Sequence, residues 1–522
     1  MELSRAVGRL LGVRAIDVPS RPGAARVAAG TSAVVVGGGI AGMSAAVVLA
    51  ERRVAVTVLE AEARLGGRLS AQPVTLPDGS RHAVDHGFHA FFRQYYNWRA
   101  ILRRIDQRLA MLRPIPGYPV ISADWPEEEF GRLPPAPPLN LLALVARSPS
   151  LRLRHLREMD GAAALALLAY DPDATYRELD EVSATDLLDS LRLPDRARAM
   201  LFEVFAHSFF NHERDMSAAE LVASFHFYFL GNPEGLGFDA PFRDYDTAIW
   251  RPLAGYVRQH GGRVQTEARV TTVKQTVGGW AVGTAEGPEY AAPYLVLAVD
   301  PPALRDLVSA APDLAAVGPD LASRAGALPA GPPYAVARFW FDRDVAAGRP
   351  IFSGVSRQPT LDSVTLYHRL ETGARDWARR TGGAVVELHA YACPDSMPAP
   401  EVAERMRREL AALWPETPNT PVHLHARVQA QAPSFDRGRA GRRPGVVTDA
   451  DGVYLAGDGI ATELPSALME RAAVTGILAA NAILARAGAT TEPLRSVPPR
   501  GMLAGRGRRP ASADLAGEAP SS

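Results

Sequence analysis

The sequence predicts a mixed α/β (α+β) fold of two lobes, each built from segments that lie far apart in the chain. The 522 residues exceed the roughly 250–300 that one hydrophobic core usually serves. Apolar runs typical of buried strands end in glycine turns at 33–42 and again at 453–459, and a helix-like stretch follows each turn. We therefore expect a discontinuous α/β domain that is interrupted by a lobe of mixed sheet and helix.

The first of these turns has the spacing of a dinucleotide-binding loop. After the run 33–36, Gly37, Gly39 and Gly42 form the pattern G-x-G-x-x-G and open a helix-like stretch over 40–52. In such a Rossmann-type unit the first glycine permits a tight turn, the second lets the backbone approach a pyrophosphate, and the third lets the helix close on the strand. The positive end of the helix then faces the phosphates.

A second strand-like run supports this interpretation. Residues 54–59 are small, β-branched or aliphatic and end at Glu60. The dinucleotide fingerprint places an acid that hydrogen-bonds a ribose about 20 residues after the glycines, which is where Glu60 lies. Because a carboxylate there disfavours a 2′-phosphate, FAD or NAD is favoured over NADP.

Composition excludes several other classes of function. The formal net charge is zero, which gives no electrostatic reason for a nucleic-acid partner. The single cysteine, Cys393, allows no intrachain disulfide or cysteine metal site and favours an intracellular setting. Lys274 is the sole lysine and hence the sole candidate for Schiff-base chemistry. No uninterrupted apolar run reaches the roughly 18 residues that span a membrane.

Segment 83–97 is dense in titratable and aromatic side chains. It contains Asp85, His86 and His89, which we expect to supply polar contacts beside a bound cofactor. Two histidines three residues apart could bind a metal, but no carboxylate-rich partner motif follows them, so we expect no metal site.

Segment 184–230 carries seven of the 17 phenylalanines of the chain, a concentration typical of a pocket for an extended apolar molecule. His207, Asn211 and His226 are among the few polar side chains between these aromatic residues. They are candidates for orienting a substrate or for moving protons, and packing in an ordinary core is the alternative for each.

The two ends of the chain and two apolar stretches complete the predictions. Residues 1–30 carry five arginines without a continuous apolar core, and we expect a flexible arm. Residues 488–522 are rich in Pro, Arg and Ser, and we expect a disordered tail. The stretches 139–153 and 162–169 fit either buried helices or helices that lie on a membrane surface.

Four motifs together resemble the flavin amine oxidase and phytoene desaturase superfamily over about 31–485. They are the glycine turn, Glu60, the run Gly66-Gly67-Arg68 and the pair Gly457-Asp458. The segments 87–97, 205–211, 225–237 and 495–501 are similar to the carotenoid ring-aromatising enzymes, the β-carotene desaturase/methyltransferases or isorenieratene synthases.

The resemblance implies a domain plan and an FAD site. The plan is a Rossmann-type FAD-binding domain of 31–105, 245–300 and 441–487, with a substrate-binding lobe of 106–244 and 301–440. In the flavin desaturases a Gly-Gly-Arg run passes beneath the diphosphate and a strand near Val270 approaches the adenine. The implied cofactor residues are Gly37, Gly39, Ile40, Ala41, Gly42, Glu60, Ala61, Gly66, Gly67, Arg68, Val270, Gly457, Asp458 and Glu470.

The resemblance also implies a reaction on a lipophilic carotenoid. A β-ionone ring would be desaturated with an intramolecular 1,2-methyl shift to give an aromatic end group. The candidate proton-transfer residues are His89, Asp85 and His207, and the candidate pocket residues are Phe91, Phe92, Tyr95, Phe209, Phe210, His226 and Tyr228. We expect a cytoplasmic protein that associates peripherally with the inner face of the cell membrane.

Three other functions share this fold class. A desaturase of acyclic, phytoene-type carotenes needs the same flavin and the same apolar tunnel. An amine oxidase relies on a lysine near the flavin, whereas Lys274 falls in a predicted strand of the nucleotide domain. A prenyl-lipid carrier similar to Rab GDP-dissociation inhibitors needs no flavin and predicts a degraded flavin site, whereas Glu60, Arg68 and Asp458 are all present.

Overall fold

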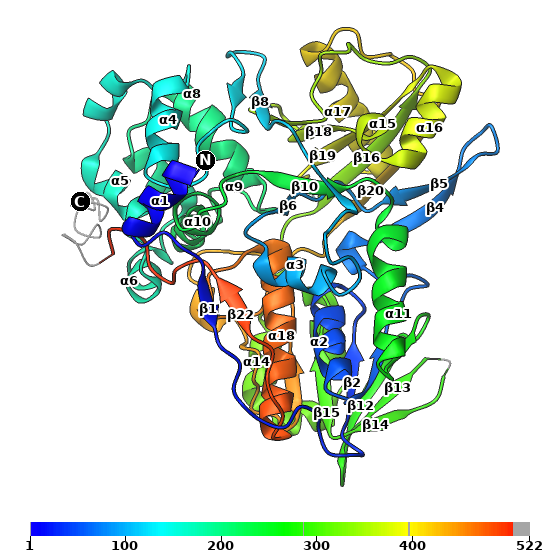
Figure 1. Ribbon diagram of the computed structural model, residues 1–522. Helices are drawn as coiled ribbons and strands as arrows, with labels where there is room; N and C mark the ends of the chain where they lie inside the picture. Colours follow the sequence, from blue (N-terminus) through cyan, green and yellow to red (C-terminus); the bar gives the residue numbers. More distant parts are fainter. Residues whose placement is uncertain (1, 286, 395–396, 505–522) are drawn as a thin grey trace, which may run out of the picture.

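Two lobes make up the protein, which is seen in Figure 1 as a computed structural model that describes residues 2–285, 287–394 and 397–504. The lower lobe in this view holds a parallel sheet with helices in front of it. The upper lobe holds a larger sheet on one side and a group of helices on the other. The chain passes repeatedly between the two lobes, so neither is a continuous piece of sequence.

The lower lobe is organised around a five-stranded parallel sheet. Its strands lie in the order β11, β3, β2, β15, β21, and every neighbouring pair is parallel. Their bounds are Arg263–Gln265, Ala55–Leu59, Ser32–Val36, Tyr294–Leu297 and Val453–Leu455. The predicted strand, helix and strand at the first glycine turn are thus present as β2, α2 (Ile40–Glu51) and β3.

Layers cover both faces of this sheet. On one face lie α2, α11 (Arg251–Gln259) and α18 (Leu468–Arg486), side by side in Figure 1. On the other lies an antiparallel sheet of β12 (Val270–Thr276), β13 (Gly279–Thr284) and β14 (Tyr290–Ala292). The helices α2 and α18 approach closely because Gly476 has no side chain: a Cβ there would lie 2.1 Å from the carbonyl oxygen of Ala41.

The predicted domain boundary at residue 300 differs from the structure. Helices α12 (Pro301–Ser309), α13 (Pro312–Val317) and α14 (Pro319–Gly326) pack on the lower lobe, with α12 and α13 against β12. These helices follow β15 directly, and a short connection keeps them beside the strand that they leave. The upper lobe therefore resumes only after them, at β16.

The upper lobe contains a seven-stranded sheet in the order β20, β16, β19, β18, β17, β8, β9. Its pairs are antiparallel except β17 with β8. The bounds are His423–Gln429, Tyr334–Phe341, Ala384–Ala390, Ser363–Leu366, Phe352–Val355, Pro119–Ile121 and Glu128–Glu129. The helices of this part are α15 (Tyr367–Leu370), α16 (Thr372–Thr381) and α17 (Ala399–Leu413).

The two faces of this sheet differ in character because side chains alternate along each strand. One face, which includes Ala337, Phe339 and Val386, forms an apolar core with α17. The opposite face carries Arg338, Glu387 and other polar residues, although β16 and β19 are buried along their whole length. That second face borders the space between the lobes.

The aromatic segment predicted as a pocket lies in the helical part of the upper lobe. Its helices are α4 (Leu139–Arg147), α5 (Gly161–Leu168), α6 (Pro172–Leu179), α7 (Ala184–Ser190), α8 (Asp195–Ala197), α9 (Val204–His207) and α10 (Ala218–Phe225). π-helical turns occur at Arg198–Glu203, His226–Leu230 and Asp246–Trp250, and 3₁₀ turns at Gly67–Leu69, Leu153–Arg157 and Ala440–Arg442.

Short strands and one helix join the lobes. A three-stranded sheet has the order β6 (Phe91–Phe92), β10 (Phe238–Pro241), β7 (Leu112–Pro114). A hairpin is formed by β4 (Ala71–Thr75) and β5 (Arg81–Asp85), and α3 (Tyr96–Leu102) packs on α18.

Both predictions for the ends of the chain are wrong for the described residues. Residues 2–18 contain α1 (Glu2–Leu10) and β1 (Ile16–Val18), and β1 pairs antiparallel with β22 (Leu494–Ser496). Ser4 Oγ donates to the carbonyl oxygen of Ala136 at 3.0 Å. The two ends hold each other in place through this pairing, which local composition does not reveal. Of the predicted tail 488–522, residues 505–522 lie outside the described residues.

One helix within the described ranges, α18, is long and apolar enough to cross a membrane. It is 19 residues long, and 72% of its apolar window is buried inside the protein. Its packing against α2 and α3 identifies it as a core helix of the lower lobe.

Candidate functional site

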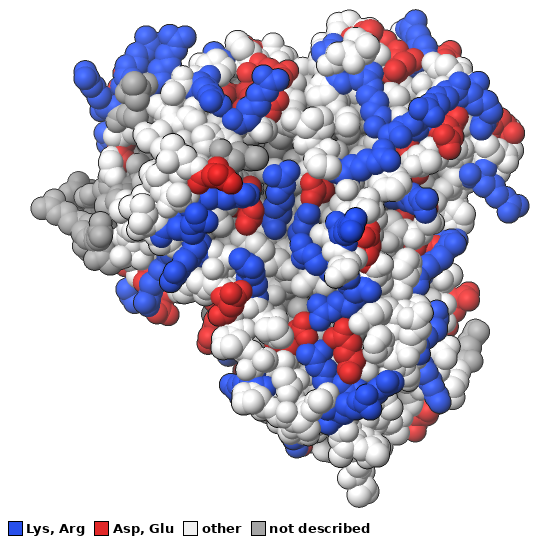
Figure 2. All heavy atoms as spheres, viewed as in Figure 1, with Lys and Arg blue, Asp and Glu red and all other residues white. Residues whose placement is uncertain are grey.

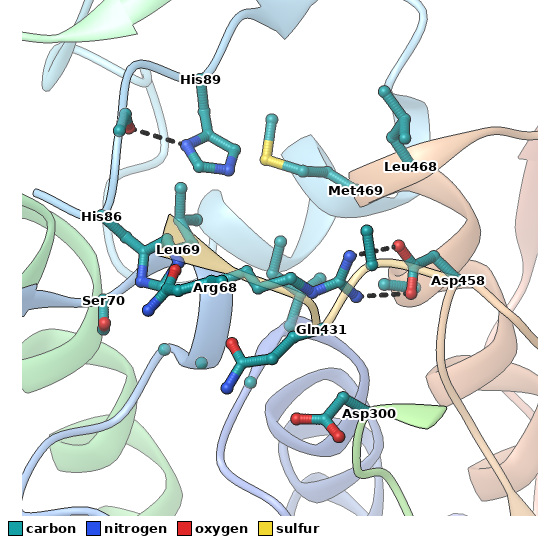
Figure 3. Close-up of a pocket in the computed structure, with 18 of the residues that line it drawn as sticks. Arg68, Leu69, Ser70, His86, His89, Asp300, Gln431, Asp458, Leu468 and Met469 are labelled. Carbon is teal, nitrogen blue, oxygen red and sulfur yellow. Dashed lines mark hydrogen bonds and ion pairs between the residues drawn. The ribbon is translucent and has the colours of Figure 1, made fainter. Parts of the chain in front are cut away.

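A cavity of about 1240 Å³ lies between the lobes and receives side chains from both. The glycine turn, β3 and the start of α18 contribute to it from below, and the upper sheet and the aromatic helices contribute from above. Pockets for a single ligand usually measure about 300–1,000 Å³. This cavity therefore has room for a cofactor together with a second molecule. Figure 3 shows its central part.

The lower end of the cavity is a slot without side chains. A Cβ added to Gly39 would meet nothing closer than the Gly66 carbonyl oxygen at 3.9 Å, and one added to Gly67 would lie 3.9 Å from the Cα of Gly39. The two glycine runs thus face each other across the opening, where a side chain would fill the space. The slot lies at the N-terminus of α2, whose free N–H groups suit a diphosphate.

Glu60 lies beside this slot at the end of β3. Its Oε2 accepts a hydrogen bond from the backbone N–H of Gly38 at 2.7 Å, and its Oε1 accepts one from Glu62 N–H at 2.9 Å. Burial raises the pKa of Glu60, and these backbone donors oppose the rise. Each carboxylate oxygen keeps a lone pair that can accept from a ribose hydroxyl.

Arg68 and Asp458 join the two halves of the lower lobe across the cavity. The guanidinium donates through Nη1 to Oδ2 at 2.8 Å and through Nη2 to Oδ1 at 2.6 Å, as the dashed lines in Figure 3 show. Arg68 follows the Gly66-Gly67 turn, whereas Asp458 follows β21, so two motifs 390 positions apart meet here. The pair places a cation and an anion side by side in the lining of the cavity, beside the glycine slot.

Most residues predicted to bind the cofactor line this cavity, and two do not. Those that line it are Gly37, Gly39, Ile40, Ala41, Glu60, Ala61, Gly66, Gly67, Arg68, Val270, Gly457 and Asp458. Gly42 lies behind the turn, where a Cβ would be 1.9 Å from the Gly37 carbonyl oxygen, so it serves helix packing instead.

Glu470 is the second exception. Its Oε1 accepts from the backbone N–H and the side-chain amide of Asn97, and its Oε2 accepts from the Trp98 N–H. Burial raises the pKa of Glu470 to about 7 against these donors. The side chain therefore caps the N-terminus of α3 and points away from the cavity, because its position on α18 faces that helix.

The upper end of the cavity is lined by aromatic rings. We call this part the aromatic chamber, and its rings belong to Phe88, Phe92, Tyr95, Tyr118, Phe205, Phe209, Tyr228, Phe238 and Phe352. Many of these rings contact one another edge to face, for example Phe92 with Tyr228 at 4.9 Å between ring centroids, whereas Phe88 stacks on Phe352. Phe210 lines the cavity nearer to Tyr334, with 5.0 Å between the ring centroids.

Phe91 and His226 were predicted in this pocket but lie in the core. Phe91 is fully buried, because alternation along β6 turns it away from the cavity that Phe92 faces. His226 stacks on Tyr170 and donates from Nε2 to the Pro498 carbonyl oxygen at 2.7 Å. Burial lowers the pKa of His226 to about 4, so it is neutral at physiological pH.

Of the three predicted proton-transfer residues, only His89 borders the cavity. Its Nδ1 donates to the Gly87 carbonyl oxygen at 2.8 Å, and Figure 3 shows its ring directed towards the space above Arg68 and Met469. Burial lowers the pKa of His89 to about 4. The imidazole is therefore neutral at physiological pH.

Asp85 and His207 lie outside the cavity lining. Asp85 is buried behind the wall, where its Oδ1 accepts from the Tyr245 N–H at 3.0 Å, and burial raises its pKa well above the usual range. His207 lies at the end of α9 with a side chain that is 46% exposed, beside Asp362. The prediction that these two side chains reach the cavity is therefore wrong. The periodicity of the strand directs Asp85 behind the cavity wall, and that of the helix directs His207 towards Asp362.

Sequence reasoning missed the polar residues that the upper sheet contributes. His389, Arg427, Gln429 and Gln431 line the cavity, and Glu387 lies directly behind His389. The sequence signal for these residues was Glu387, a charged residue in the middle of a buried strand. Because an ion is costly to bury without a partner, such a residue indicates polar neighbours on the same face. No group of three or more metal-binding side chains occurs within the described ranges.

Comparison with known proteins places these features in a family. The family model described as flavin containing amine oxidoreductase matches residues 40–484. The carotenoid phi-ring synthase of Streptomyces griseus is 44% identical over 504 residues, which cover 96% of this chain and 97% of that protein. The carotenoid phi-ring synthase of Chlorobaculum tepidum is 30% identical over 597 residues, with coverage of 90% and 91%.

Solved structures share the fold at low sequence identity. Putrescine oxidase bound to putrescine superposes with a TM-score of 0.63 at 18% identity, covering 87% of this chain and 99% of that one. Cyclohexylamine oxidase from Brevibacterium oxydans gives a TM-score of 0.62 at 15% identity, covering 87% and 98%. These two likenesses concern the fold alone.

Proposed function

The chain belongs to the flavin-containing amine oxidoreductase family, and from that membership we propose that it is an FAD-dependent enzyme that oxidises an end ring of a carotenoid. The cofactor is FAD, as in the family and its flavoenzyme neighbours. The observation that carries the proposal is the continuity of the cavity. A glycine-lined slot for a dinucleotide at one end opens into the aromatic chamber at the other.

The proposed substrate is the β-ionone ring of β-carotene. Its geminal dimethyl carbon has no hydrogen to lose, so the ring becomes aromatic only if one methyl group moves to the neighbouring carbon. Loss of a hydride leaves a ring carbocation, the 1,2-methyl shift relocates the charge, and loss of a proton forms a double bond. A second loss of hydride and proton completes the arene. FAD supplies the two-electron acceptor for each hydride.

The chain itself stabilises the cation and excludes water. Aromatic faces attract a carbocation by about 0.5–2 kcal/mol for each well-placed ring. In the chamber Phe92, Tyr95 and Tyr228 contact one another, and the two tyrosine hydroxyls are hydrogen-bonded to each other at 2.7 Å. A dry site prevents capture of the cation as an alcohol.

Two observations favour this function over its relatives in fold. Lys274, the sole lysine, is exposed on β12 and does not line the cavity, so the lysine that amine oxidases use has no counterpart there. A flavin-free prenyl-lipid carrier has no need of the slot between Gly39 and Gly67 or of the Arg68–Asp458 pair. A desaturase of acyclic carotenes would use the same cavity, and substrate turnover distinguishes it.

Turnover of defined carotenes tests the proposal. The protein is produced in a bacterial host that makes β-carotene and, separately, in one that makes only acyclic carotenes, and pigments are separated by chromatography. We expect β-carotene to be replaced by a product whose mass is lower by four hydrogens for each converted ring. Conversion of acyclic carotenes alone would refute the ring chemistry. A colourless protein without flavin absorbance would refute both the ring chemistry and the FAD-dependent oxidation of acyclic carotenes.

We also propose that the protein contacts the inner face of the cell membrane from the cytoplasm. Leu3, Leu10 and Leu142 are 72%, 87% and 61% exposed, and they lie on the neighbouring helices α1 and α4. The same two helices carry exposed arginines, including Arg9 and Arg147. Apolar side chains with a basic rim suit an anionic bilayer surface. Elsewhere on the face in Figure 2, acidic and basic side chains are interspersed.

A further inference from the structure

A buried charged array lies on the cavity face of the upper sheet. Arg338 on β16 and Glu387 on β19 are opposite each other in register and are 2% and 0% exposed. Arg338 donates from Nε and Nη2 to Glu387 Oε2 at 2.9 and 2.6 Å. Taking two ions out of water costs several kcal/mol each, so such a pair seldom stabilises a fold more than apolar residues would. Its presence suggests a role other than stability.

The array ends in a histidine that borders the cavity. His389 lies two residues beyond Glu387 on the same face of β19, and its Nε2 is 2.9 Å from Glu387 Oε1. Burial alone would raise the pKa of Glu387, but the Arg338 charge and the His389 hydrogen bond hold it at about 2. The carboxylate can only accept, so the 2.9 Å contact assigns the proton of the neutral imidazole to Nε2, although the Phe88 N–H also lies 3.3 Å from Nε2 as the longer branch of its hydrogen bond to Glu387. The backbone N–H of Phe88 donates to the same carboxylate oxygen at 2.7 Å.

The other ring nitrogen of His389 is left as a base. With the proton on Nε2, the neutral imidazole has a lone pair on Nδ1. Among residues 2–285, 287–394 and 397–504, no side chain or backbone group hydrogen-bonds this atom. A base whose second nitrogen is oriented by a carboxylate is the arrangement that positions general bases in other enzymes.

We propose that His389 takes up the proton lost from the carotenoid ring, with Glu387 and Arg338 as positioning residues. The proposal rests on the proposed function. A C–H bond next to the cationic carbon breaks, its electron pair becomes the ring double bond, and the proton passes to Nδ1 of His389. Bound FAD would be the acceptor of the hydride lost in the preceding step, so each desaturation balances as one hydride and one proton.

His89 borders the same cavity but is a poorer proton acceptor. Its Nδ1 is bonded to a neutral carbonyl, that of Gly87, and burial lowers its pKa to about 4. Both rings lie near Gly87: Nδ1 of His89 bonds its carbonyl oxygen, and a Cβ on Gly87 would be 3.2 Å from the His389 ring. A proton on His389 lies one hydrogen bond from an ionised carboxylate, whereas no acidic side chain within the described ranges hydrogen-bonds the His89 ring. His89 is therefore a neutral wall of the site.

Replacement of His389 by asparagine tests the assignment. The purified holoenzyme of His389→Asn is compared with the wild type on whichever carotene the wild type converts, with flavin content measured from absorbance. We expect full flavin content and a turnover rate lower by about 10²- to 10⁴-fold, the contribution typical of a positioned base. The matched control is His207→Asn, a half-exposed histidine outside the cavity, which should keep the wild-type rate.

The split between kcat and KM in Glu387→Gln tests the positioning role. Without the carboxylate, Nε2 of His389 loses the hydrogen bond that orients the ring, so kcat should fall while KM for the carotene and flavin content stay at wild-type values. A merely structural role would lower flavin content and raise KM together with the loss of kcat. Because Glu387→Gln leaves Arg338 unpaired, the double variant E387Q/R338M is measured beside it.

The outcomes separate the two proposals. A wild type that converts no cyclic carotene refutes the proposed ring chemistry, and the proton acceptor is then judged on the acyclic carotene that it does convert. A wild type that converts neither refutes both. A His389→Asn enzyme that retains the wild-type rate overturns the assignment of the base, and an unchanged kcat in both Glu387 variants overturns the positioning role. If His89→Asn loses turnover while His389→Asn keeps the wild-type rate, the proton acceptor is His89 instead of His389.

Discussion

Replacement of Gly39 by alanine should separate cofactor binding from folding. Gly39 has φ −80° and ψ −170°, a conformation that alanine adopts without strain. The added Cβ would have no protein atom closer than the Gly66 carbonyl oxygen at 3.9 Å. Because the substitution also restricts the unfolded chain, the free energy of unfolding of the apoprotein should stay constant or rise by about 0.4–1 kcal/mol.

The same methyl group should weaken FAD binding strongly. It would project into the slot opposite Gly67, where the diphosphate must approach the backbone. Losing one hydrogen bond to a charged oxygen costs about 1.5–3 kcal/mol. That cost corresponds to an affinity lower by about 10- to 150-fold, since each 1.4 kcal/mol is a factor of ten.

Two other glycines supply the controls. At Gly255 in α11 a Cβ meets nothing within 4 Å, so Gly255→Ala should leave FAD affinity unchanged. At Gly42 a Cβ would lie 1.9 Å from the Gly37 carbonyl oxygen, so Gly42→Ala should destabilise the apoprotein itself. Affinity is measured by titrating apoprotein with FAD and following flavin fluorescence, and stability by urea unfolding. A Gly39→Ala protein that binds FAD within twofold of the wild type would refute the assignment of the slot.

Four further predictions follow from the site and its surroundings. Asp458→Asn should lower FAD affinity by about 10-fold or more, because it removes the partner of Arg68; equal flavin occupancy after dialysis would contradict this. Phe92→Leu should slow ring conversion by about 2- to 30-fold, the loss of one cation–π contact of 0.5–2 kcal/mol, with unchanged flavin content. Folding lowers the pKa of His226 to about 4 from an ordinary 6.5, so the contribution of this residue to stability is complete above pH 6.5 and is lost as pH falls towards 4. The free energy of unfolding of the wild type, measured with urea, should therefore fall between pH 7.5 and 5 by about 2 kcal/mol more than that of His226→Asn. Leu10→Asp combined with Leu142→Asp should reduce sedimentation with anionic vesicles and leave the unfolding midpoint unchanged, and undiminished sedimentation would remove α1 and α4 from the membrane surface.

The fold class, the family and the cofactor were predictable because their signals are local. A strand, a glycine turn and a helix occupy 32–51, and the elements predicted there agree with the structure to within one residue. Gly37 is required by backbone geometry at its own position, where φ is +106° and a Cβ would lie 2.4 Å from the Ala298 carbonyl oxygen. The prediction of FAD and of the flavin amine oxidase superfamily is confirmed by the family match and the relatives.

The assignment of side chains to the cavity depended on the direction in which each side chain points, and the spacing of residues in the sequence does not reveal that direction. Asp85 and Phe91 lie next to cavity residues in sequence and His226 lies two positions before Tyr228, yet each side chain points into the core. Glu470 caps α3, a helix more than 360 positions away in the chain. Such contacts arise only when separate elements pack together.

The sequence by itself determined the Rossmann-type nucleotide unit, the choice of an unphosphorylated ribose and the supply of aromatic residues for an apolar pocket. Each of these rests on residue types and spacings within one short segment, where the backbone fixes geometry directly. Only the tertiary structure decided that β1 and β22 hold the ends of the chain together and that Arg68 meets Asp458. It alone placed His389 with Glu387 and Arg338 beside the cavity, because strand pairing, rather than sequence proximity, brings β16 and β19 into register.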